Sequence, residues 1–180
     1  MNSDISELLI DARSELVELE DVKRNSKWVE YDTSYYFHLL NALDFASRFV
    51  KGSNDSTQEE DVGSTLRRLM DFFNPVLEKE EVVRSDLDER IVEYEFLTSL
   101  GKPHGLNDEQ YQALVMIRNC AYATIRYTKE KLDLTEEITR LDKADREMRG
   151  ILQATWEALE QGSHLKRPSY FPSTEFWWYA

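Results

Sequence analysis

Apolar residues recur at three- and four-residue steps through most of the chain, which is the spacing of one face of an α-helix. The first such series is Ile5, Leu8, Leu9, Ala12, Leu16, Leu19 and Val22. Asp4 and Glu7 lie at its start and Lys23, Arg24 and Lys27 at its end, as the helix dipole favours. The pattern predicts an amphipathic helix that begins near Ser3.

A second helix is predicted between Asp32 and Gly52. Asp32 or Thr33 can cap its start, because short polar side chains accept hydrogen bonds from the free amides there. Gly52 is a natural terminator. The segment between them is unusually apolar, with Tyr36, Phe37, Leu39, Leu40, Leu43, Ala46, Phe49 and Val50.

The start of a third helix can be placed in two ways. Thr57 with Glu60 resembles a capping box, and Ser64 is a competing start. Pro75 removes a backbone hydrogen bond and clashes with the preceding turn, so a break is expected near residues 73–74.

Two further helices follow. Ser85 with Asp88 can cap the fourth, which ends at Gly101, and Asn107 with Gln110 forms a capping box for the fifth. The fifth carries apolar residues on most sides, which predicts the central helix of a bundle. These residues are Tyr111, Leu114, Val115, Met116, Ile117, Cys120, Ala121, Ala123 and Ile125.

The last helix is predicted after Thr135 and ends at Gly162. It carries a seam with alternating steps of three and four: Ile138, Leu141, Asp145, Met148, Leu152, Thr155 and Leu159. Because two seam positions are polar, packing along the bundle is favoured over a free-standing coiled coil. Ion pairs with four-residue spacing are expected on its exposed face, namely Glu136–Arg140, Asp142–Arg146 and Asp145–Arg149.

Strand patterns are almost absent from the sequence. The predicted fold is therefore all-α: a compact bundle of five or six helices over residues 1–167, followed by an aromatic segment at residues 168–180. That segment can be a docking segment, whose anchors in a partner groove are Tyr170, Phe171, Phe176, Trp177 and Trp178. It can also be a strap over a groove between helices, held extended by its prolines.

The formal net charge of the 180 residues is −13. Such a charge argues against direct nucleic-acid binding, which rests on basic residues, and against an anionic membrane surface. It fits a solubilising coat or a surface that attracts a basic partner. Residues 78–95 hold eight acids and three bases, and their Glu80, Glu81, Asp88 and Glu89 are candidate partner-binding residues.

Cellular location is suggested by three features. The amino terminus lacks a secretion-signal pattern, no apolar run reaches the length of a membrane span, and Cys120 is the only cysteine. We therefore expect a cytoplasmic protein.

Catalytic motifs are missing. The three histidines, His38, His104 and His164, are not at metal-ligand spacing, and no nucleophile motif or phosphate-binding loop occurs. No catalytic residue, metal or cofactor is predicted. Cys120 is interpreted as a buried small apolar residue.

Two weaker sites compete with structural interpretations. Acids three residues apart, at Glu15/Glu18, Glu78/Glu81 and Asp142/Asp145, can hold a divalent metal in a helical bundle or simply face solvent. Arg118, Tyr122 and Arg126 share a stripe of the fifth helix and can contact an anion or nucleotide. Alternatively, the arginines form internal ion pairs.

The leading functional prediction is a non-catalytic protein-binding subunit, adaptor or inhibitor, whose partner has a basic or groove-like surface. A sharper version is an inhibitor that mimics nucleic acid with the acids of residues 78–95. The alternatives are a divalent-metal nucleotide hydrolase and a homo-oligomeric structural protein that associates through the seam.

Overall fold

The computed structural model describes residues 3–28, 31–51, 55–102, 104–159 and 166–179, and it contains helices but no strand in those ranges. The helices are α1 (Ser3–Asn25), α2 (Thr33–Val50), α3 (Ser56–Met70), α4 (Phe73–Leu77), α5 (Glu80–Leu100), α6 (Asp108–Thr128) and α7 (Thr135–Ala158). The predicted all-α bundle with a C-terminal aromatic segment is confirmed.

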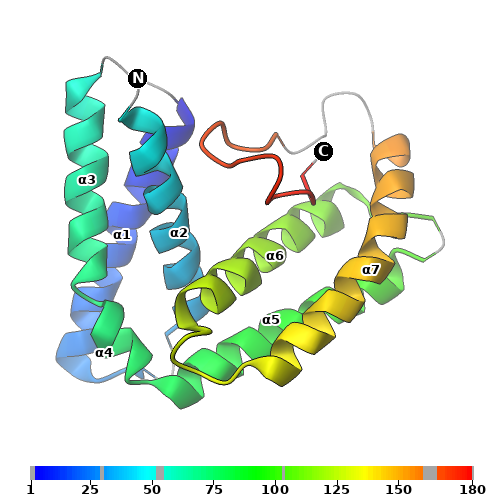
Figure 1. Cartoon of the computed structure of the whole chain (residues 1–180), viewed down its shortest axis with the longest axis horizontal. Helices are drawn as coiled ribbons and strands as arrows, with labels where there is room; N and C mark the ends of the chain where they lie inside the picture. Colours follow the sequence, from blue (N-terminus) through cyan, green and yellow to red (C-terminus); the bar gives the residue numbers. More distant parts are fainter. Residues whose placement is uncertain (1–2, 29–30, 52–54, 103, 160–165, 180) are drawn as a thin grey trace.

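The helices form two groups that meet along α2 and α6 (Figure 1). In one group α1, α2 and α3 pack side by side, and in the other α5 packs against both α6 and α7. Both groups contribute to one apolar core, in which Leu40 of α2, Ile91 of α5 and Tyr111 of α6 are fully buried. The predicted central helix, α6, thus shares its central position with α2.

Two predicted helix starts follow from local capping. The Asp32 carboxylate accepts a hydrogen bond from the Tyr35 amide at 3.0 Å at the start of α2. Asn107 and Gln110 form the reciprocal capping box of α6, at 2.9 and 3.0 Å. Gly52, the predicted terminator of α2, lies outside the described residues.

The predicted starts of α3 and α5 were wrong. Helix α3 begins one residue before Thr57, because Asp55 accepts a hydrogen bond from the Gln58 amide at 3.0 Å and caps the helix. Helix α5 begins at Glu80 rather than near Ser85, with no side-chain cap. Its first turn carries the acids Glu80 and Glu81, which the helix dipole favours at this end, and Val83 is buried in the core.

The break at Pro75 falls earlier than predicted, between Met70 and Phe73. Pro75 itself lies in the first turn of α4, where a backbone amide has no partner within the helix. The missing amide of proline therefore costs little at this position.

Helix α7 lies along α5, and the seam residues Leu141, Met148, Leu152 and Thr155 are buried. The three predicted ion pairs within this helix, Glu136–Arg140, Asp142–Arg146 and Asp145–Arg149, were wrong, because none of them forms among the described residues. Arg140 instead pairs with Asp88 and Glu95 of α5, and Asp145 pairs with Arg118 of α6. Gly162, the predicted end of this helix, lies outside the described residues.

The aromatic segment folds back over α2 and α6 (Figure 1). Phe45 of α2 makes edge contacts with Phe171 and Phe176, with ring centroids 5.7 and 5.5 Å apart. Phe171, Phe176 and Trp178 are each 1% exposed, and all belong to the same core as the helices.

Candidate functional site

The outward side of α5 carries an acidic half and an apolar half. The opposite side of the helix is buried in the core through Val83, Leu87, Ile91 and Tyr94. We define the outer face of α5 as Glu81, Asp88, Glu89, Val92, Phe96 and Leu100, all of which are exposed. Its acids precede its apolar residues along the helix axis.

The apolar half of this face was missed by sequence reasoning. Val92, Phe96 and Leu100 are 50%, 61% and 46% exposed, which is unusual for three large apolar side chains in one row. They are spaced four residues apart and therefore line up along the helix. That spacing, read against the core positions of the same helix, was the signal that could have identified them.

The four predicted acidic binding residues are all exposed on α5. Glu80 pairs with Arg84 at 3.0 Å, and Asp88 pairs with Arg140. For Glu81 and Glu89, the described part of the chain supplies no basic side chain within ion-pair distance. No ion pair with a described residue therefore competes with a partner for these two carboxylates.

The predicted aromatic anchors divide into two sets. Phe171, Phe176 and Trp178 are buried in the chain's own core, whereas Tyr170 and Trp177 are half-buried. These contacts match the strap interpretation. A docking role for the segment stays a prediction.

Hydrogen bonds fasten the end of this segment to α6. The Trp178 indole donates to the Asn119 side chain at 2.8 Å, and the Tyr111 hydroxyl donates to the Trp178 carbonyl at 3.1 Å. The Arg149 guanidinium of α7 lies 3.7 Å from the ring centroid of Trp177, a cation–π contact. The segment thus bridges α6 and α7.

Arg118, Tyr122 and Arg126, the predicted anion-binding residues, line one pocket of about 360 Å³ between α6 and α7. Arg118 donates two hydrogen bonds to Asp145, at 2.9 and 2.8 Å. Arg126 pairs with Asp44 at 3.1 Å. The arginines therefore form internal ion pairs and also line a shared pocket.

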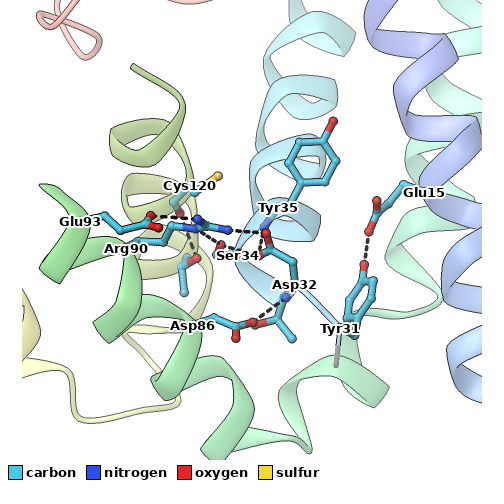
Figure 2. A network of polar contacts seen from close by, with 11 residues as sticks. Glu15, Tyr31, Asp32, Ser34, Tyr35, Asp86, Arg90, Glu93 and Cys120 are labelled. Atoms are coloured by element: carbon cyan, nitrogen blue, oxygen red, sulfur yellow. Dashed lines mark hydrogen bonds and ion pairs between the residues drawn. The ribbon is translucent and has the colours of Figure 1, made fainter. Parts of the chain in front are cut away.

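A polar network holds the start of α2 against α5 (Figure 2). Arg90 pairs with Asp32, the capping residue of α2, and with Glu93 at 3.0 Å, and it donates to the Ser34 hydroxyl at 3.0 Å. Asp86 accepts hydrogen bonds from the Thr33 amide and hydroxyl, at 2.7 and 2.6 Å. The carboxylates of this network already accept hydrogen bonds from the chain itself, so we interpret the network as structural.

The carboxyl group of Glu15 is buried beside this network (Figure 2). It accepts a hydrogen bond from the Tyr31 hydroxyl. Burial raises the pKa of Glu15 to about 7, although the Tyr31 hydrogen bond acts in the opposite direction. Burial also raises the pKa of Tyr31, so Tyr31 remains the donor at neutral pH.

The candidate metal-binding pairs do not share one environment. Glu15 is buried, while Glu18, Glu78, Glu81 and Asp142 are exposed. Within the described residues, no group of three or more His, Cys, Asp or Glu side chains is placed to hold a metal ion. The metal-dependent hydrolase stays a prediction that no contact supports.

Two further titratable groups are held in their neutral forms. Burial lowers the pKa of His38 to about 4, and burial raises the pKa of the Cys120 thiol to about 12. Neither is charged at neutral pH, and the buried Cys120 matches its interpretation as a small apolar residue. His104 is exposed, and His164 lies outside the described residues.

Within the described ranges, no helix combines the length and apolar character needed to cross a bilayer. Comparisons with protein-family models, with curated proteins and with solved structures find no match for this chain.

Proposed function

We propose that this chain is a non-catalytic protein-binding subunit that contacts its partner through the outer face of α5. The observation that carries this proposal is the exposed row of Val92, Phe96 and Leu100, continuous with the acids Glu81 and Glu89. Exposed apolar patches with a polar surround are typical of interaction sites. A partner that covers the row would remove this apolar area from water.

The charge of the face indicates the chemistry of the partner. Its acidic half attracts Lys and Arg, and the net charge of −13 adds a long-range attraction for a basic molecule. The face extends over 19 residue steps from Glu81 to Leu100, which is roughly 29 Å of helix. A basic amphipathic helix of about 20 residues in another protein fits both its length and its two halves.

The apolar half supports a protein partner rather than pure mimicry of nucleic acid. A phosphate mimic needs only spaced carboxylates, whereas Phe96 offers an aromatic anchor. An inhibitor of a nucleic-acid-binding protein remains compatible with this face, if that protein presents a basic amphipathic helix.

The test is affinity capture with matched variants, followed by titration of the purified partner. Phe96→Asp is expected to weaken binding at least about tenfold, and the double variant E81K/E89K to weaken binding and reduce its salt dependence. Val17→Asp is the control, because Val17 on α1 is at least as exposed as Phe96, at 69% against 61%. Equal binding by F96D and V17D would exclude this face.

Light scattering of the isolated protein distinguishes binding to another protein from self-association through the same face. A dimer that Phe96→Asp dissolves would assign the face to a second copy of the chain and overturn the proposal. A monomer at working concentration leaves the face open for a partner, as proposed.

A further inference from the structure

The pocket between α6 and α7 is separate from the outer face of α5, and it lies along one side of α6. The residues that line it are Arg118, Tyr122, Ile125, Arg126, Lys129, Ile138, Leu141 and Asp142. Its volume of about 360 Å³ falls in the range of small-molecule sites. Three of the lining residues are basic and one is acidic, in a protein whose acids strongly outnumber its bases.

The outer end of this pocket, at Arg126 and Lys129, is lined by basic side chains. Arg126 and Arg48 share the single carboxylate of Asp44, at 3.1 and 2.6 Å. Lys129 is exposed, and none of the described acids lies within ion-pair distance of it. Two acids lie beside the same pocket: Asp142 on the opposite wall, and Glu175, whose carboxylate accepts a hydrogen bond from the Tyr122 hydroxyl.

The inner end is lined by Arg118, whose guanidinium is largely enclosed by its neighbours. The Arg118 side chain is only 9% exposed; its Nε and Nη2 are bound to Asp145, and Trp178 covers the guanidinium at 4.4 Å. Its Nη1 is buried and has no hydrogen-bond partner among the described residues. Because this nitrogen is closed to solvent, Arg118 contributes positive charge to the inner end rather than a free hydrogen-bond donor.

The middle of the pocket is apolar. Its apolar lining comes from Tyr122 and Ile125 of α6 and from Ile138 and Leu141 of α7. Arg118 and Arg126 are eight residues apart in one helix, which is roughly 12 Å along its axis. One compact anion cannot contact both ends, whereas an elongated molecule can.

We propose that this pocket binds a small organic anion with an apolar body. The phosphate or carboxylate group lies beside Arg126 and Lys129. The apolar body covers Ile125 and Leu141, and the far end lies toward Arg118. Charge-assisted hydrogen bonds supply orientation, and the apolar contacts supply the selectivity against inorganic anions.

Isothermal titration calorimetry with octyl phosphate and octanoate tests this assignment. Inorganic phosphate, which has the anionic group without the alkyl chain, and octanol, which has the chain without the anionic group, are the half-ligands for comparison. We expect one-site binding of at least one amphipathic anion, at least about tenfold tighter than either half-ligand. The comparison of octyl phosphate with octanoate decides between a phosphate and a carboxylate. Amide chemical shifts should change at Tyr122, Ile125 and Ile138.

Lys129→Ala should weaken binding about tenfold, because it removes a charged hydrogen-bond donor. Lys131→Ala is the matched control, since Lys131 is exposed two residues away and does not line the pocket. Lys129 is itself exposed, and a melting temperature equal to that of the unmodified protein would show that its removal leaves the fold intact.

Three results would overturn the proposal. They are absence of binding by both amphipathic anions, inorganic phosphate that binds as tightly as octyl phosphate, and equal affinities of the Lys129→Ala and Lys131→Ala variants. Each is independent of the outer face of α5, whose residues do not change in this experiment.

Discussion

Trp178 donates its indole hydrogen to the side-chain oxygen of Asn119 at 2.8 Å, across 59 residues of sequence. The amide nitrogen of the same Asn119 donates to the Tyr179 hydroxyl at 2.8 Å. One buried amide therefore holds the last two aromatic residues of the described chain, and both its oxygen and its nitrogen have partners. These contacts make the aromatic segment part of the folded core.

Trp178→Ala is expected to lower the free energy of unfolding by about 3–5 kcal/mol, because it leaves a cavity in the core. It also leaves the Asn119 oxygen without its donor. Trp177→Ala is the neighbouring control. It should lower the free energy of unfolding by less than half as much, since Trp177 is only half-buried. Urea unfolding measures both, and equal losses would show that the segment does not pack as described.

The buried Glu15–Tyr31 contact predicts a pH-dependent stability. The pKa of Glu15 is about 7 in the folded protein, against 4.5 for an ordinary glutamate. Between these two pH values the folded chain retains a proton that the unfolded chain has released. Stability should therefore fall as pH rises from about 4.5 to about 7, by at most about 3 kcal/mol from this group.

Glu15→Gln should remove this contribution, because glutamine does not titrate and can still accept the Tyr31 hydrogen bond. The comparison is urea unfolding at several pH values for the unmodified protein, Glu15→Gln and the exposed control Glu20→Gln. If the stability difference between the unmodified protein and Glu15→Gln is constant across this range, the carboxyl group is not buried as a neutral acid.

The Arg118–Asp145 pair predicts a large cost for removing one partner alone. Its side chains are 9% and 13% exposed, and the Tyr94 hydroxyl donates to Asp145 at 2.9 Å. Asp145→Ala should cost about 3–5 kcal/mol, because the guanidinium is left buried without its counter-ion. The double variant R118M/D145L should recover much of this loss in a double-mutant cycle.

An exposed ion pair between α7, which also carries Asp145, and the segment after α5 supplies the control for that cycle. Lys102 and Glu147 pair with side chains that are 53% and 40% exposed. Lys102→Ala should lower the free energy of unfolding by less than about 1 kcal/mol. Similar costs for the two pairs would show that the Arg118–Asp145 pair is hydrated rather than buried.

Two glycines should respond to alanine in opposite directions. Gly105 has a φ of +85°, and a Cβ there would lie 2.7 Å from the backbone nitrogen of Thr155, so Gly105→Ala should destabilise by at least about 1–2 kcal/mol. Gly150 lies inside α7 with open space around its Cα, so Gly150→Ala should stabilise by about 0.5–1 kcal/mol. Thermal unfolding distinguishes the two, and a loss of stability in Gly150→Ala would contradict the open space described here.

Local signals in the sequence determined the helices themselves. The three- and four-residue spacing of apolar positions and the caps at Asp32 and Asn107 act within one or two turns, so they can be read without knowing the fold. The start of α5 was misplaced for the same reason. No side chain caps this helix, and the capping pattern of Ser85 and Asp88 lies within it rather than at its start.

Only the tertiary structure decided which charges meet and which apolar residues stay outside. Arg140 has acids nearby in its own helix, yet it pairs with Asp88 and Glu95, because the packing of α7 on α5 brings two carboxylates to it. The seam position Asp145 is polar because Arg118 lies opposite it. Val92 and Phe96 fit an ordinary amphipathic pattern, and their exposure depends on the side from which α6 and α7 pack against α5. The spacing of residues along the chain determines which of them share a helix face. The residues that pack against that face come from segments far away in the sequence, so local spacing cannot identify them.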